Sequence, residues 1–289
     1  MSRFADIDFF HWATFAMALL SMTLGAGIVA YLFWEGGPFI WNQGSQFLLG
    51  LDWFPDDEEY GAAPMIFGSA AVTFLALIFS TPLALASAIY TSEFLDPRRR
   101  LTVKGIMEIL AGVPGIVYGL LGVSLLSIWV RDVFNLVDGY TLLSASFLLA
   151  IMILPTIMTL SEDAIHSTPS DYRQAASGLG LSKMEILFSV ALPHAAPGIA
   201  GAILLAIGRA MGETIAVMLV IGGLDRIPEP WFDVFSSGQS IASKLGREAA
   251  ETLGFGEHWS ALMALALILF FLVMFLTAFG NWLIKGFRK

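Results

Sequence analysis

Two charged side chains lie inside a long apolar run, in the segment GRAMGETIAV at 208–217. Arg209 follows Pro197 by 12 residues, a helical rise of roughly 18 Å, which places it near mid-bilayer if the run spans a membrane. Glu213 follows at i+4, on the same predicted helix face. A charge at that depth is costly and usually faces a cavity or a partner. A guanidinium binds oxyanions well, so Arg209 is a predicted substrate-pathway residue. Glu213 is predicted to be a second one, because it could hold the guanidinium in position or modulate its charge.

The same spacing also allows a purely structural role for the two charges. A self-neutralising Arg209–Glu213 pair would lock helices together without touching a substrate. In the functional alternative, the two offset each other at rest and an arriving anion competes with Glu213 for the guanidinium. Neutral replacement of both residues separates the two hypotheses, because only a structural pair would tolerate the loss of both charges.

A second unusual stretch is MEILAGVPGIVYGLLG, at 107–122. Glu108 is expected near the inner end of an apolar span and is a third predicted pathway residue. Pro114 and the glycines weaken the helix here, while Tyr118 offers a hydrogen-bond donor whose partner the sequence does not identify. The alternative is plain helix packing, since small residues at this spacing permit close contact.

The segment DYRQAASGLGLSKMEILFSVALP, at 171–193, is polar within an otherwise apolar chain. Thr168 and Asp171 predict a capped helix start, and Gly180 predicts a left-handed turn after it. Ser182 and Glu185 predict a capping box for a second short helix, which Pro193 and Pro197 are expected to limit. The small side chains of the first helix would let another protein approach closely. The alternative is a solvated helical hairpin at a membrane surface.

The composition indicates a helical membrane protein. The 289 residues are 57% hydrophobic and 13% charged, with mean hydropathy +0.76, whereas soluble domains are about 25% charged. A net charge of −9 argues against a nucleic-acid partner, and the absence of cysteine excludes disulfides and thiolate sites. We find no catalytic motif, metal-ligand spacing or nucleotide-binding loop, so neither an intramembrane enzyme nor a resident cofactor is expected.

Apolar runs of about 20 residues predict an all-α polytopic fold with six transmembrane helices in a single domain over 1–289. The predicted spans are 10–34, 65–91, 105–130, 141–160, 197–222 and 259–284. Ten of the 15 basic residues flank one side, at Arg3, 98–104, 173–183 and 285–289. The positive-inside rule therefore places both termini and the 161–196 loop in the cytoplasm, while the other face is acidic through Asp56, Asp57, Glu58 and Glu59.

The polar segment resembles the cytoplasmic EAA loop of ABC-transporter permeases. Gln174-Ala175-Ala176, Gly180, Val190, Leu192 and Pro193 stand in register with that pattern, and Gln174 replaces its usual glutamate. The resemblance implies that 168–193 docks onto a separate ATP-hydrolysing subunit. Gln174, Ala175, Ala176, Gly180 and Pro193 would then be the coupling residues.

The segments ILAGVPGIVYG, GRAMGETIAV and AIMILPTIMTLSEDAI together resemble the phosphate-specific transport permeases, nearest to the PstC type, over about 65–285. This implies a type I ABC-importer permease (MetI-like) fold in the inner (plasma) membrane. It also implies a heterodimer with a PstA-type permease, a PstB-type ATPase dimer and a PstS-type phosphate-binding protein. Another oxyanion, such as molybdate, tungstate or sulfate, is the alternative substrate. A non-transporting receptor or sensor would have no use for the coupling spacing.

Overall fold

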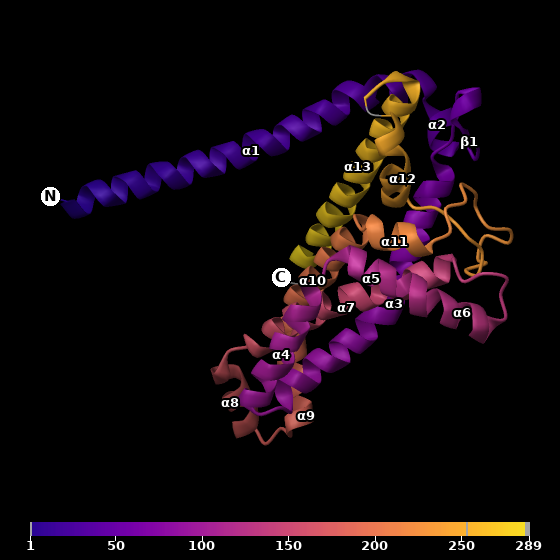
Figure 1. The fold of residues 1–289 in the computed structure, drawn as a ribbon. Coiled ribbons are helices and arrows are strands. Elements are labelled where there is room, and N and C mark those ends of the chain that lie inside the picture. Colours follow the sequence, from indigo (N-terminus) through magenta and orange to yellow (C-terminus); the bar gives the residue numbers. More distant parts are fainter. Residues whose placement is uncertain (1, 253, 287–289) are drawn as a thin grey trace.

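The computed structural model describes residues 2–252 and 254–286 and consists mainly of helices (Figure 1). The longer helices are α1 (Ser2–Gln43), α3 (Ala63–Glu93), α4 (Pro97–Ala111), α7 (Leu142–His166), α10 (Leu192–Met211), α12 (Ile241–Thr252) and α13 (Gly256–Gly286). The shorter ones are α2 (Ser45–Leu49), α5 (Gly115–Leu121), α6 (Ser127–Phe134), α8 (Ser170–Gly178), α9 (Lys183–Ile186) and α11 (Ile215–Val220), with a 3-10 turn at Pro55–Asp57. Strands β1 (Trp53–Phe54) and β2 (Glu59–Tyr60) form an antiparallel hairpin. Within these described residues, six helical segments are long and apolar enough to cross a membrane, which confirms the predicted all-α, six-span fold.

The third span begins later than the sequence predicts. Residues 97–111 form the separate helix α4, and the span runs over Gly115–Phe134 instead of 105–130. The chain breaks between them because Pro114 lacks an N–H and disfavours helical geometry in the residue before it. Glu108 therefore lies on α4, outside the span where it was predicted.

The fifth span also differs from its prediction. It is a single helical segment, Lys183–Met211, that passes through Pro193 and Pro197, so the prediction that these prolines limit the second short helix is wrong. A π-helical turn at Leu187–Ala191 precedes Pro193. Such a turn shifts the hydrogen bonds by one residue, and proline is tolerated in the first turn of the helix that follows. The predicted continuation to 222 is instead broken at 212–214, before α11.

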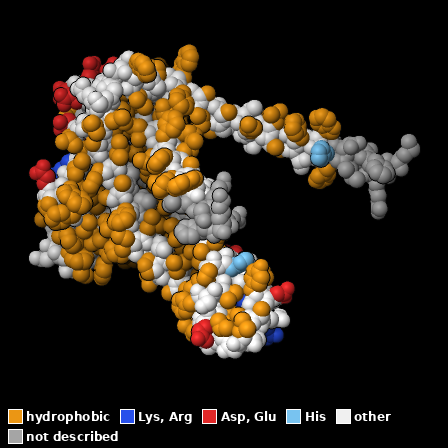
Figure 2. All heavy atoms as spheres, turned by 180° about the vertical axis from the view of Figure 1, so that it is seen from behind, with side chains coloured by type: hydrophobic (Ala, Val, Ile, Leu, Met, Phe, Trp, Pro, Cys, Tyr) orange, Lys and Arg blue, Asp and Glu red, His pale blue; other side chains and the backbone are white. Residues whose placement is uncertain are grey.

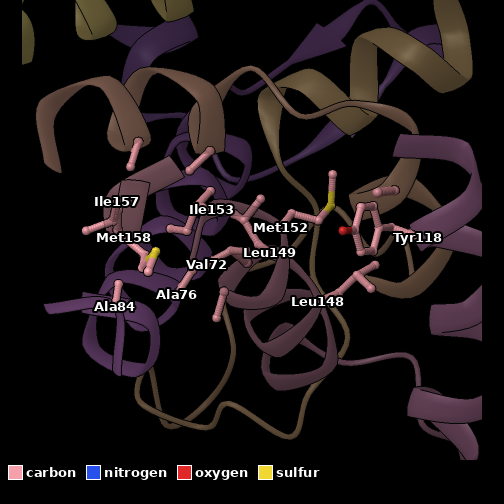
Figure 3. Close-up of a cluster of buried hydrophobic side chains, with 14 of the residues drawn as sticks. Val72, Ala76, Ala84, Tyr118, Leu148, Leu149, Met152, Ile153, Ile157 and Met158 are labelled. Atoms are coloured by element: carbon pink, nitrogen blue, oxygen red, sulfur yellow. The ribbon is translucent and has the colours of Figure 1, made fainter. Parts of the chain in front are cut away.

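Helices α3 and α7 form the centre of the molecule, and α7 is the most buried span, at 72% of its apolar window. Ala76 and Ala84 of α3 are fully buried, and their small size lets α7 approach closely. Figure 3 shows Ile153 and Ile157 of α7 filling the space beside them. This core supports the helices that carry the site.

Helix α1 projects away from the rest of the molecule in Figure 1. Residues 10–35 include no buried side chain, and the helix packs against α13. A membrane-length apolar helix in this state needs lipid or another protein around it.

The two ends of the molecule differ in charge. Figure 2 shows acidic side chains gathered at the end that carries the β hairpin. The opposite end is formed by α8, α9 and the start of α4 (Figure 1), where Arg100, Lys104, Arg173 and Lys183 lie. Arg288 and Lys289, which belong to the predicted basic C-terminal end, lie outside the described residues.

Candidate functional site

The two sequence stretches singled out for their glycines form two helix breaks with the same geometry. Helix α4 ends at Gly112 with φ −85° and ψ −7°, and α5 begins at Gly115. Helix α10 ends at Gly212 with φ −87° and ψ −4°, and α11 begins at Ile215. In each case a span is interrupted within the apolar part of the chain. Interrupted helices of this kind are where transporters place binding sites.

The fold brings the two breaks together, because α5 packs against α11. A Cβ added at Gly119 of α5 would lie 3.1 Å from the Ala216 Cα, so the absence of a side chain here favours the close approach of the two helices. The sequence alone did not predict this contact, since the two breaks are about one hundred residues apart.

Arg209 reaches from the second break to the first. Its guanidinium donates from Nη2 to the Ala111 carbonyl and from Nη1 to Thr156 Oγ1, each at 3.0 Å. Thr156 lies near the middle of α7, consistent with the mid-bilayer depth predicted for Arg209. The side chain is half-buried and lines a cavity of about 680 Å³ between α7, α10 and α13. Arginine has five N–H donors, so these two bonds leave donors for a ligand.

Glu213 does not pair with Arg209. Helix α10 stops at Met211, so the i+4 geometry does not extend to Glu213, and no salt bridge joins the two in the described residues. Instead Glu213 Oε1 accepts from the Ala216 N–H at 3.3 Å. The carboxylate also lies against Gly115, where a Cβ would come within 2.6 Å of Oε1. The expectation of a mutually offset pair is therefore wrong, although both side chains still converge on the first break.

Tyr118 and Arg209 donate hydrogen bonds to backbone carbonyls at the end of α4. The Tyr118 hydroxyl donates to the Leu110 carbonyl at 2.9 Å, next to the Ala111 carbonyl that Arg209 holds. The last carbonyls of a helix lack partners within it, so these two side chains stabilise the break. Glu108 is not brought into this group: it is an exposed residue on α4.

The polar segment forms α8 and α9, as predicted. Gly180 adopts φ +82° between them, and the Ser182–Glu185 capping box is present. The predicted Thr168 cap is wrong: the helix starts at Ser170 after Pro169 in an extended conformation, without a side-chain cap bond. Local side-chain hydrogen bonds therefore set the start of the second helix but not that of the first.

The residues predicted to couple to an ATPase lie on the surface of this segment, with one exception. Gln174, Ala175, Gly180 and Pro193 are exposed, whereas Ala176 is buried against the body of the protein. Leu179 is 82% exposed at the tip of the segment.

Arg173 anchors this segment, a role that sequence reasoning missed. Its Nη1 donates to both carboxylate oxygens of Glu93, at 2.7 and 2.9 Å, and its Nη2 donates to the Ile165 carbonyl at 2.9 Å. Lys183 also donates to the Glu93 carbonyl and lies 4.8 Å from the centre of the Phe94 ring. The ends of α3 and α7 thus hold α8. The nearest acidic residue in sequence, Asp171, is only two positions away and so does not face Arg173 on a helix, which was the available signal for a distant partner.

A second ionic cluster holds α4 against α7. Glu162 is fully buried, with Arg100 Nε at 2.5 Å and Lys104 Nζ at 3.7 Å from its carboxylate oxygens. Arg100 Nη1 also lies 2.7 Å from His166 Nε2, and Lys104 pairs with Asp163. The cluster thus fixes the first half of α4, the helix whose other end forms the first break.

Comparison with known proteins gives consistent matches. The family described as "Binding-protein-dependent transport system inner membrane component" matches residues 80–289. The chain is similar to "Phosphate transport system permease protein PstC" of Mesorhizobium japonicum, with 31% identity over 98% of this chain and 91% of that protein. It is also similar to the protein of that name from Pasteurella multocida, with 33% identity over 97% and 92%.

Two solved structures show the same fold at low sequence identity. The MetNI methionine ABC transporter in an inward-facing conformation aligns with TM-score 0.62 and 17% identity, over 78% of this chain and 95% of that one. A bacterial alginate ABC transporter, solved in complex with an alginate pentasaccharide-bound periplasmic protein, aligns with TM-score 0.59 and 16% identity, over 94% and 95%.

Proposed function

The chain belongs to the family of binding-protein-dependent transport system inner membrane components, and we propose that it is the PstC-type permease subunit of an ATP-driven importer of inorganic phosphate. The observation that carries the proposal is Arg209 at the two apposed helix breaks. A positive, hydrogen-bonding side chain there, with N–H donors left over, matches a small tetrahedral oxyanion. The names of the relatives favour phosphate among the oxyanions that the chemistry allows.

The mechanism follows from the two breaks. Arg209 and Glu213 each contact the first break, so any change in the relative position of α5 and α11 alters both contacts together. A phosphate at the breaks would exchange hydrogen bonds with the guanidinium, while the nearby carboxylate keeps the site weak by like-charge repulsion. Weak binding suits a permease, which must release its substrate.

We assign ATP hydrolysis to a separate PstB-type subunit that docks on α8 and Gly180. The exposed Gln174, Ala175 and Leu179 support this assignment. The anchor through Arg173 then transmits movement of α8 to the ends of α3 and α7, which form the core of the molecule.

The remaining partners follow from the exposed surfaces. A PstA-type permease subunit is the proposed partner for the apolar length of α1, which buries no side chain over residues 10–35. A PstS-type phosphate-binding protein would meet the acidic end around the β hairpin (Figure 2). Acidic side chains there do not attract free anions, so a protein carrier is useful. The basic end formed by α8, α9 and the start of α4 is assigned to the cytoplasm, and the positive-inside rule assigns both termini to the same side of the membrane.

The test is ATP-dependent phosphate uptake into liposomes that contain the permease pair and ATPase, supplied with loaded binding protein. Arg209→Gln should keep an assembled complex but reduce uptake at least tenfold, since Gln keeps hydrogen bonding and loses the charge. Arg131→Gln, at an exposed arginine paired with Asp132, is the matched control and should transport normally.

A double replacement separates a substrate contact from a structural role. Because Arg209 and Glu213 bond to different partners, Arg209→Gln with Glu213→Gln should remain inactive. Recovery of parental uptake by the double variant would assign both residues to structure alone. Uptake of sulfate, molybdate or tungstate in preference to phosphate would overturn the substrate assignment.

A further inference from the structure

A second cavity, of about 720 Å³, lies at the outer end of α11 and contains an arginine that the proposed function does not use. It is bordered by four parts of the chain: Val123 after α5, Tyr140 before α7, Met218 and Gly222 around the end of α11, and Arg247 and Glu251 on α12. Arg247 is an exposed residue. This cavity and the Arg209 group therefore lie at opposite ends of α11.

The guanidinium of Arg247 is held in place. Its Nη2 donates to the Met218 carbonyl at 2.6 Å, at the end of α11. Its Cζ lies against Gly223, where a Cβ would come within 2.7 Å, and the φ of +88° there also favours glycine. The arginine is thus ordered by one backbone bond and a flat glycine surface, and its other donors remain available to the cavity.

Arg247 repeats the arrangement of Arg209. Each guanidinium bonds to a carbonyl in the last turn of a helix, Ala111 in α4 and Met218 in α11. Each arginine is followed by a glutamate four residues later, Glu213 and Glu251. The six residues of α11 rise by only about 9 Å, so an anion could pass from one group to the other along a single short helix.

The neighbouring cations do not have the same arrangement. Lys244 is 2% exposed and is neutralised by Asp225 and Glu248, each with a carboxylate oxygen at 2.5 Å from its Nζ. Arg226 is exposed but does not line the cavity. Among the residues that line this cavity, Arg247 is the one cation.

We propose that Arg247, with Glu251 beside it, forms an outer binding station for a tetrahedral oxyanion on its way to Arg209. The inference rests on the proposed function, because it places the station on the pathway of the same permease. The guanidinium supplies charge-assisted hydrogen bonds to the anion, and Glu251 limits the affinity so that the anion moves on. On an acidic outer surface, such a station gives the released anion a local site of opposite charge.

The test measures binding of inorganic phosphate to the purified permease–ATPase complex in nanodiscs, without binding protein, by ³¹P NMR line broadening. The Arg209→Gln complex should retain a weak site. Adding Arg247→Gln should weaken that site roughly tenfold, the value of one charge-assisted hydrogen bond. In the same background, Glu251→Gln should tighten binding, and Arg226→Gln is the matched control for loss of one outer positive charge.

Each result decides the proposal. Unchanged phosphate binding on adding Arg247→Gln, or an equal loss with Arg226→Gln, would overturn the station. Tightening by Glu251→Gln supports it even if an Arg247 variant fails to assemble. A complex that binds sulfate or molybdate but not phosphate would refute the proposed substrate, and an Arg247 dependence for that anion would still support the station.

Discussion

The Arg173–Glu93 contact offers a quantitative test of how the docking segment is held. The Glu93 side chain is 8% exposed and that of Arg173 is 26% exposed, so truncation of Arg173 leaves a nearly buried carboxylate without its counter-ion. Breaking a fully buried pair costs about 3–5 kcal/mol, and losing an exposed pair costs at most about 1 kcal/mol. For this intermediate exposure we expect about 2 kcal/mol, roughly 30-fold in an equilibrium constant.

We expect this cost to be measured as weaker ATPase docking. With α8 released from α3 and α7, the ATPase subunit must order the helix as it binds, so Arg173→Met should raise its Kd roughly 30-fold. Binding to the permease complex in nanodiscs would be measured by biolayer interferometry. Arg131→Gln, which breaks an exposed pair at the other end of the molecule, should change the Kd by less than about threefold.

A double-mutant cycle tests whether the contact itself is responsible. Glu93→Gln and the double variant should each resemble Arg173→Met, giving a coupling energy of about 2 kcal/mol. If the two single effects add to within about 0.5 kcal/mol, the residues act separately and the anchoring argument is refuted. Parental docking by both single variants would refute it equally.

Three further predictions concern a turn, a close contact and a titrating carboxyl. Gly180→Val should uncouple ATP hydrolysis from uptake, because a side chain at φ +82° costs about 1–2 kcal/mol even though no neighbouring atom blocks it. Gly178→Ala, where the space is also open, is the control. Coupled uptake by the valine variant would contradict the docking role. Gly115→Ala should assemble normally yet transport poorly, since its Cβ would displace the flexible Glu213 carboxylate, 2.6 Å away; parental uptake would show that the carboxylate position is unimportant. Burial raises the pKa of the Asp225 carboxyl, so protonation of this group stabilises the folded protein as pH falls below the raised pKa, and this stabilisation is lost as pH rises. Thermal melts from pH 7 to 4 should show this contribution in the parent protein and not in Asp225→Asn. Identical pH profiles of the two proteins would contradict the assignment.

Local sequence patterns determined the spans, the two short helices of the docking segment and the left-handed Gly180. These features depend on residues close together in the chain: apolar length selects a membrane helix, a Ser182–Glu185 box starts a helix, and glycine permits φ above zero. The same local reasoning misplaced the start of the third span, because apolar composition continues smoothly through the break at Pro114.

Only the tertiary structure decided which charges meet. Helical spacing predicted that Arg209 pairs with Glu213. The helix ends between the two residues, however, and the arginine bonds to the Ala111 carbonyl, 98 residues away. Arg173 likewise finds Glu93 at a separation of 80 residues. Helix spacing specifies neighbours only while the helix continues. Where backbone groups at a break need partners, packing of distant segments decides which side chains supply them.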